Sequence, residues 1–123
     1  MQSINALTPE KREELSIQRQ QHHDVHLQFC KVIYIRQVRD GRHAHLEQPQ
    51  AALSWKTKAL SRLPGHRVTF DQCRYGACCL DKDGTWRLVK KSTSLQTSKR
   101  AVAQAMTLRC DRGRSEEHTS ELQ

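Results

Sequence analysis

The sequence predicts a single layered domain of the α/β or α+β class. Its predicted elements follow the order helix, strand, helix, strand, hairpin, strand, helix, and such alternation is typical of helices packed on a sheet. The length of 123 residues fits one domain, and an apolar fraction of 36% allows a small core. Apolar runs such as residues 32–35 are far shorter than the roughly 20 residues of a membrane-spanning helix, so we expect no membrane partner.

The first element is a long helix over residues 8–40. Thr8, Pro9 and Glu10 form a typical helix start, with a capping hydroxyl, a proline in the first turn and an acid near the positive end. No proline or glycine follows before Gly41, which we expect to cap the helix. We expect residues 1–21 to form a polar lead-in and a solvated half-helix, followed by a partial α/β domain over residues 22–113.

The second half of this helical run fits two interpretations. Spacings of three and four residues place four side chains on one helical face: Leu27, Cys30, Tyr34 and Val38. A strand is the alternative, because Val25, Leu27 and Phe29 alternate with polar residues and residues 32–35 are rich in β-branched side chains. The helix is favoured, since the uninterrupted run is long for a strand.

Two short elements come next. Residues 43–47 predict a strand that Pro49 ends. Residues 52–63 predict a helix that stops at Pro64 and Gly65, with its leucines at positions 53, 60 and 63 facing inward.

The remaining elements are strands and one helix. A strand begins at residue 68 and runs to about residue 73. The Asp-Lys-Asp-Gly turn at residues 81–84 predicts a hairpin between residues 76–80 and 85–90. Residues 93–96 predict a last strand, and Ser98 is expected to cap a final helix whose apolar residues have helical spacing: Ala101, Val102, Ala105 and Met106.

The last ten residues, 114–123, resemble the translated sequence of a common sequencing adapter, with an ordinary acidic tail as the alternative. We expect the native chain to continue differently past Gly113. Without the one arginine and three glutamates of this segment, residues 1–113 hold 20 basic and 10 acidic side chains, a net charge of +10. This charge favours polyanions, nucleic acid first and an acidic membrane surface second, with a solvated basic surface without a partner as the alternative.

The cysteines indicate a reducing compartment. Their number, five, is odd, and the N-terminus lacks the apolar segment of a secretory signal. We therefore expect thiols in an intracellular protein of the nucleus or cytoplasm. A zinc site is conceivable, but the spacing lacks the two close cysteine pairs typical of such sites. Its ligands would come from Cys73, Cys78, Cys79, Cys110, His43 and His45. Small buried thiols are favoured, and no metal or other cofactor is predicted.

No catalytic residue is predicted. Asp81, Asp83 and Gly84 partly match a calcium-binding loop, but Cys79 and Lys90 occupy its first and twelfth positions, which require oxygen ligands. The sequence contains no glycine-rich phosphate loop, serine elbow or methyl-donor loop. Enzymatic activity is therefore not expected of this chain by itself.

The clearest candidate binding site is a basic, hydroxyl-rich segment near the C-terminus. It contains Lys90, Lys91, Thr93, Thr97, Lys99 and Arg100. Cations neutralise phosphates, while hydroxyls and the amides at a helix N-terminus hydrogen-bond to them. The alternative is an exposed strand end and a solvated helical turn. Three aromatic residues are candidates for base stacking, with core or rim positions as the alternative: Trp55, Tyr75 and Trp86.

A longer string of residues is more specific. It combines Gly41-Arg42-His43, Leu46-Glu47-Gln48-Pro49, Ser54-Trp55, residues 70–76 and residues 90–97. Over about residues 22–110 this string resembles a segment of copia-like retroelement polyproteins and of related orphan proteins of protists. That segment is in turn similar to the C-terminal half of a methyltransferase-like Rossmann fold. The resemblance implies an incomplete Rossmann-like domain whose upstream half is missing from this chain.

The resemblance also implies roles for three parts of the chain. In DNA cytosine methyltransferases a strand-end glutamate contacts the target base, and a Tyr-Gly pair precedes a basic segment near the DNA. Glu47, Tyr75 and residues 90–97 occupy comparable positions, but Gln48-Pro49 replaces Asn-Val, and the donor and nucleophile motifs are absent. Independently, a carboxylate at the end of a parallel strand lies at the ligand crevice of an open sheet and accepts hydrogen bonds from an exocyclic amine. A surface glutamate before a turn is the alternative.

Together these patterns predict a nucleic-acid-associated module from a mobile-element polyprotein or a domesticated relative. The sequence does not distinguish DNA from RNA. One alternative is a C-terminal fragment of a DNA methyltransferase-like enzyme. The other is an orphan or spurious open reading frame without a selected activity.

Overall fold

The computed structural model describes residues 6–111 and the backbone of residues 119 and 120. The elements in chain order are α1 (Pro9–Arg39), β1 (His45–Pro49), the 3₁₀ turn η2 (Leu53–Lys56), α2 (Lys58–Ser61), β2 (His66–Asp71), the 3₁₀ turn η3 (Gln72–Tyr75), β3 (Cys78–Leu80), β4 (Trp86–Lys90), β5 (Ser92–Thr97), α3 (Arg100–Ala105) and β6 (Thr119–Ser120). This succession confirms the predicted mixed class and the long N-terminal helix.

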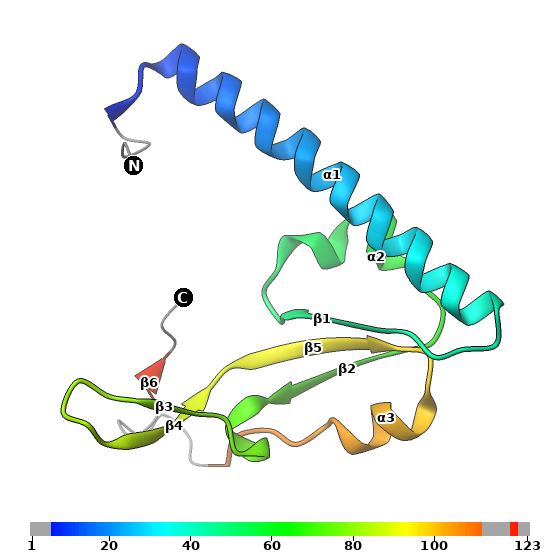
Figure 1. Ribbon diagram of the computed structural model, residues 1–123, viewed down its shortest axis with the longest axis vertical. Helices are drawn as coiled ribbons and strands as arrows, with labels where there is room; N and C mark the ends of the chain where they lie inside the picture. Colours follow the sequence, from blue (N-terminus) through cyan, green and yellow to red (C-terminus); the bar gives the residue numbers. More distant parts are fainter. Residues whose placement is uncertain (1–5, 112–118, 121–123) are drawn as a thin grey trace.

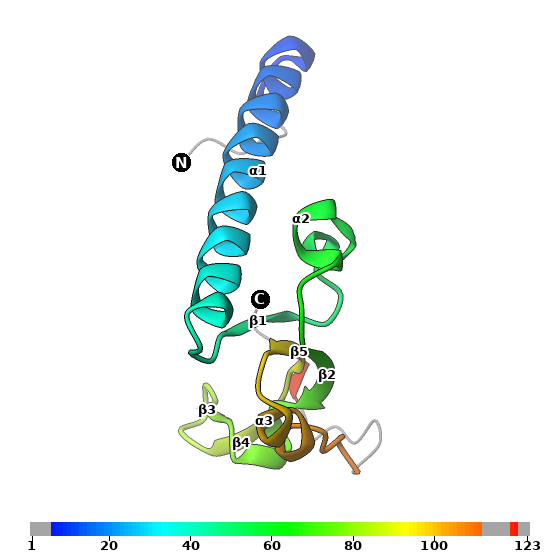
Figure 2. The same cartoon turned by 90° about the vertical axis from the view of Figure 1, so that its right-hand side faces the viewer.

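The central sheet contains three strands in the order β1-β5-β2, and both of its pairings are antiparallel. Helices α1 and α2 lie over one face of the sheet and α3 lies over the other (Figures 1 and 2). The expectation that β1 is a parallel strand is therefore wrong. A Rossmann-like sheet is built from parallel strands joined by crossover helices, so the Rossmann-like or methyltransferase-like assignment is not confirmed.

Helix α1 confirms the helical interpretation of residues 25–39. Lys11 N donates a hydrogen bond to Thr8 Oγ1 at 3.3 Å, and proline occupies the first turn. Gly41 follows the helix with φ of 75°, a left-handed conformation that suits glycine. The first half of α1 extends away from the sheet (Figure 1), and most of its residues are exposed.

Only one side of the second half of α1 is packed. Leu27 and Tyr34 are buried, and the Tyr34 hydroxyl donates to the Pro64 carbonyl at 2.7 Å. Burial raises the pKa of Tyr34. The opposite side of the helix carries exposed apolar side chains, namely Val25, Phe29, Val32 and Ile33.

The main core lies between α1 and the segment formed by η2 and α2. Leu27, Trp55, Ala59 and Leu60 form a buried cluster, against which Leu46, Ala52 and Leu63 pack. The inward positions expected for Leu60 and Leu63 are confirmed. The inward position expected for Leu53 is wrong, because its side chain is 77% exposed. The predicted helix over residues 52–63 breaks at Thr57, whose extended backbone (φ −71°, ψ 156°) separates η2 from α2.

The middle strand, β5, is polar but buried on both faces. Leu95 is its single apolar residue, so its polar side chains need internal hydrogen bonds. Gln96 Nε2 donates to the carbonyls of Leu63 and Pro64 at 3.3 and 3.1 Å, and its Oε1 accepts from Arg67 Nε at 3.1 Å. Arg67 also lies 4.3 Å from the Trp55 ring centroid, and burial lowers the pKa of its guanidinium. These bonds tie the sheet to the core cluster.

The predicted hairpin is confirmed. Strands β3 and β4 pair antiparallel, with Cys78 opposite Leu88. Arg87 on β4 forms ion pairs with the turn residues Asp81 and Asp83 at 2.8 and 3.5 Å. The hairpin extends from one end of the central sheet, as Figure 1 shows.

The final helix begins differently from the prediction. Lys99 is the N-cap of α3 and makes no side-chain capping bond. The expected cap, Ser98, instead accepts a hydrogen bond from Ala44 N at 2.9 Å. Ala103 is buried against the sheet. No helix in the described part of the chain is long and apolar enough to cross a membrane.

The predicted adapter-derived segment, residues 114–123, lies mostly outside the described residues. Its described part is β6, whose backbone pairs with β4 in parallel, with Thr119 opposite Val89 and Ser120 opposite Lys90.

Candidate functional site

The basic, hydroxyl-rich segment predicted at residues 90–100 is not assembled into one site. Thr93 and Thr97 are fully buried in β5. The Thr93 hydroxyl accepts from Gln72 Nε2 at 2.9 Å, and the Thr97 hydroxyl bonds to His45 Nδ1 at 2.8 Å. Both hydroxyls therefore stabilise the sheet and do not face solvent, where a phosphate would bind.

The cations of this segment lie at opposite ends of β5. Lys90 and Lys91 precede the strand, whereas Lys99 and Arg100 follow it. Five residue steps of a strand span about 17 Å, so the two pairs do not converge. Helix α3 has only six residues, and Lys99 N donates to Thr97 Oγ1 at 3.1 Å. Lys99 and Arg100 are exposed and stay available to solvent.

The two residues taken from the methyltransferase resemblance lie in different elements. Glu47 is exposed in the middle of β1, opposite Leu95, and not at a strand end. Tyr75 lies on η3, where its hydroxyl donates to the Ala105 carbonyl at 2.7 Å and accepts from Leu108 N at 3.1 Å. Its ring packs edge-on against Phe70 at 5.3 Å. Tyr75 therefore fastens the segment after α3 to the sheet.

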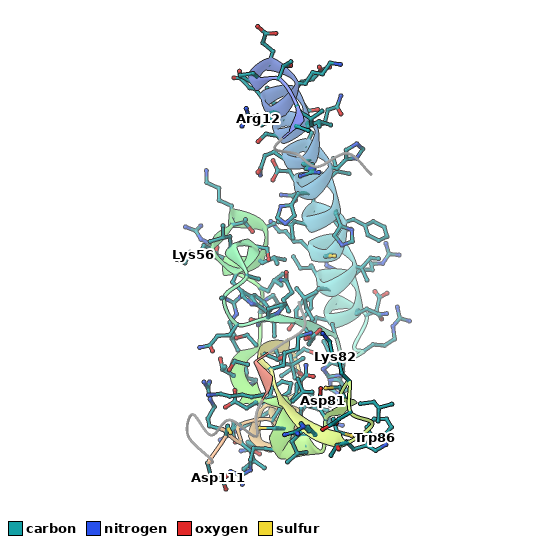
Figure 3. The ribbon with its side chains drawn as sticks, turned by 90° about the vertical axis from the view of Figure 1, so that its left-hand side faces the viewer. Arg12, Lys56, Asp81, Lys82, Trp86 and Asp111 are labelled. Carbon is teal, nitrogen blue, oxygen red and sulfur yellow. The ribbon has the colours of Figure 1, made fainter. Side chains whose placement is uncertain are left out.

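The other two aromatic candidates differ in exposure. Trp55 belongs to the core, which the alternative to base stacking predicted, and its Nε1 donates to the Pro49 carbonyl at 3.1 Å. Trp86 is 67% exposed on the hairpin, and Figure 3 shows it on the same projecting element as Asp81 and Lys82. Its ring remains accessible.

The six residues considered for zinc do not form a metal site. Among the described residues, no group of three or more histidine, cysteine or acidic side chains is placed to hold a metal ion. His45 bonds to Thr97, and Cys78 and Cys79 are on the hairpin strand β3. Cys73 is buried, as the favoured interpretation of small buried thiols predicts, whereas Cys78 is exposed and Cys79 and Cys110 are half-buried.

A groove lies between α1 and the segment from β1 to α2. Its volume is about 760 Å³. From α1 it is lined by Arg12, Ser16, Arg19, Gln20 and His23, and from the opposite wall by Gln48, Ala52, Leu53, Ser54 and Thr57. Figure 2 shows α1 standing beside α2, and Figure 3 shows Arg12 near the far end of α1, with Lys56 on the segment opposite.

Helical periodicity explains why these α1 residues share one wall. Positions 12, 16, 19 and 23 are separated by four, three and four residues, which places them on one face. Four residues further, the same face reaches Leu27, and then Tyr34, which are buried in the core. This face of α1 is therefore apolar in the second half of the helix, which packs on the core, and basic in the first half, which extends beyond the core. The helical spacing of these basic residues is present in the sequence, but from the sequence alone the polar first half of the helix was interpreted only as a solvated surface.

The groove is electropositive. No acidic side chain is among its described lining residues, whereas two arginines and a histidine are. Within residues 6–111, neither Arg12 nor Arg19 takes part in an ion pair. Both guanidinium groups are exposed and keep their five donors each for an anionic ligand.

The opposite wall contributes a polar residue held in place. Gln48 Oε1 accepts a hydrogen bond from Ser54 Oγ at 2.5 Å, which fixes the orientation of the amide. Its Nε2 is buried and has no hydrogen-bond partner in the part of the chain that the structure describes. A buried donor without an acceptor costs about 1–3 kcal/mol, so an acceptor at this wall would be stabilising.

This arrangement is suited to binding a phosphate backbone. Cations spaced along a helix bind successive phosphates, and amide and hydroxyl donors position the chain. Comparison of the chain with protein-family models, with curated proteins and with solved structures found no match.

Proposed function

We propose that this chain is a nucleic-acid-associated module that binds the phosphate backbone in the groove between α1 and residues 48–57. The observation that carries the proposal is the row of Arg12, Arg19 and His23 along one wall, with no acidic lining residue described. The net charge of +8, or +10 without residues 114–123, adds long-range attraction for a polyanion.

The binding mode is independent of base sequence. The described lining residues include no aromatic side chain to stack on bases, and the cations contact phosphates, which carry no sequence information. Exposed Lys99 and Arg100 are on another part of the surface and contribute to the general attraction, not to the groove.

The test is a fluorescence anisotropy titration of a short labelled duplex between about 50 and 200 mM salt. Replacing Arg12 and Arg19 by glutamine removes two phosphate contacts, so the slope of log K against log salt becomes shallower by about 1.8 for B-DNA. The matched control replaces Lys11 and Arg39 by glutamine, which makes the same change in charge on α1 outside the groove.

The control pair is expected to keep the wild-type slope. Equal slopes for the two double variants would show that only net charge matters and would contradict the groove assignment. A single-stranded DNA and an RNA arm identify the preferred nucleic acid. Absence of salt-dependent binding in every arm would favour the alternative of an open reading frame without a selected activity.

The finer classification rests on the sequence resemblance. We propose an origin in a copia-like retroelement polyprotein. The genomic reading frame upstream of this sequence tests it: a donor-binding half-domain encoded there would support the proposal, and its absence would count against it. The antiparallel central sheet gives the methyltransferase-like alternative no support.

A further inference from the structure

The segment after α3 is fastened to the far end of β2. The amide of Asp71, the last residue of β2, donates to the Leu108 carbonyl at 2.9 Å. Arg74 Nη1 donates to the Arg109 carbonyl at 2.9 Å. We call residues 107–111 the C-terminal strap.

A buried carboxylate fixes the strap at Cys110. Asp71 is 2% exposed and accepts hydrogen bonds from Cys110 N at 2.6 Å and from Ser92 Oγ at 2.5 Å. Arg109 Nε adds an ion pair with the same carboxylate at 3.2 Å. The backbone of Cys110 is thereby held over η3.

The anchoring brings two thiols together. Cys73 on η3 is 7% exposed, and the bonds from Cys110 N to Asp71 and from Arg74 on η3 to the Arg109 carbonyl place Cys110 beside it. Burial, the contact with Cys110 and the nearby charge of Asp71 all raise the pKa of Cys73. Cys110 is more exposed than Cys73, so it is the sulfur that a solution reagent reaches first.

We propose that Cys73 and Cys110 form a reversible redox clasp, in which oxidation by a low-molecular-weight disulfide such as glutathione disulfide joins the strap covalently to η3. The Cys110 thiolate attacks one sulfur of glutathione disulfide, giving a mixed disulfide and releasing one glutathione thiolate. Cys73 gives up its proton and attacks the Cys110 sulfur, releasing the second glutathione. Two electrons pass from the protein thiols to glutathione disulfide, and the two protons end on the two glutathione thiols.

The clasp gives the strap two states. In the reduced state the strap is held by the contacts of Asp71, Arg74 and Tyr75, which can open locally. In the oxidised state the bond closes a loop from residue 73 to residue 110 that contains β3, β4, β5 and α3. Such a loop restricts the unfolded chain and stabilises the fold. The clasp is independent of the groove on α1.

The test equilibrates the full chain in glutathione redox buffers, alkylates the remaining thiols and maps disulfides by mass spectrometry. The expected product links the peptides of Cys73 and Cys110, loses 2 Da and reverts on reduction. The variant Cys110→Ser loses this product, whereas replacement of Cys78 and Cys79 by serine keeps it. Stable glutathione adducts without the link, or a link between other cysteines, would overturn the proposal.

Thermal unfolding provides a second measurement, in which each chain is compared with itself in oxidising and reducing buffers. The oxidised wild-type chain is expected to unfold about 10 °C higher than the reduced chain. The Cys110→Ser chain is expected to show no such difference between the two buffers. An equal shift in Cys110→Ser, or no shift in the wild type, would contradict the clasp.

Discussion

Asp71 is the polar group on which the packing of the C-terminal strap most depends. It is nearly inaccessible to solvent, yet ionised, because its pKa is held below the usual range. Burial acts to raise that pKa, but the hydrogen bonds from Cys110 and Ser92 and the charges of Arg109 and Lys90 outweigh it. The substitution Asp71→Asn keeps the shape of the side chain and removes the charge and one acceptor.

The expected cost follows from these contacts. A hydrogen bond to a charged group contributes about 1.5–3 kcal/mol, and the half-exposed Arg109 adds less than about 1 kcal/mol. We expect Asp71→Asn to lower the free energy of unfolding by about 2 kcal/mol. In urea this moves the unfolding midpoint down by about 1.5 M if the slope is near 1.3 kcal/mol/M. The control Asp111→Asn, on the same strap but exposed, is expected to change the midpoint little.

The pH dependence has a defined sign. A carboxyl whose pKa is lower in the folded than in the unfolded state stabilises the fold above the unfolded pKa of about 3.9. That stabilisation is lost as pH falls through the lower folded value. The difference between wild type and Asp71→Asn is therefore largest near neutral pH and shrinks below about pH 4. A difference that persists unchanged at pH 3, or that is under about 0.5 kcal/mol at pH 7, would refute this reasoning.

Two further stability predictions use matched controls. Leu60 is fully buried, so Leu60→Ala is expected to cost about 2–5 kcal/mol in urea unfolding, whereas Leu53→Ala, at an exposed position, costs little; equal effects would contradict the described core. Gly65 and Gly84 both have positive φ. A Cβ at Gly65 would collide with the Thr97 carbonyl oxygen, whereas a Cβ at Gly84 would have open space around it. Thermal unfolding should therefore show a greater loss for Gly65→Ala than for Gly84→Ala, and a reversed order would count against this close approach.

Local sequence patterns predicted the ends of helices and turns well, because particular residues there, such as proline and glycine, fix the backbone conformation. The Thr8-Pro9-Glu10 start and Gly41 define α1, and the turn ending in Gly84 defines the hairpin. The strand direction was not predictable in this way. Whether β1 pairs parallel or antiparallel with β5 depends on the path of about 40 residues between them, which periodicity does not report.

The candidate site shows the same limit. Thr93 and Thr97 are hydroxyl residues beside lysines, a composition typical of phosphate contacts, but β5 is the middle strand and buries them. Their partners, Gln72 and His45, are distant in the sequence, so no local pattern identifies them. For the groove, the helical spacing of the basic residues on α1 could be recognised in the sequence. The opposite wall, formed by residues 48–57, could not be predicted, because it depends on how distant parts of the chain pack.

Amide NMR of the labelled chain, titrated with a short duplex, tests the claim that nucleic acid occupies the groove between α1 and residues 48–57. The predicted result is a shift of the Gln48 side-chain amide together with the backbone amides of residues 52–57. A titration that leaves these signals in place while the amides near Lys90 or Lys99 move would contradict the claim.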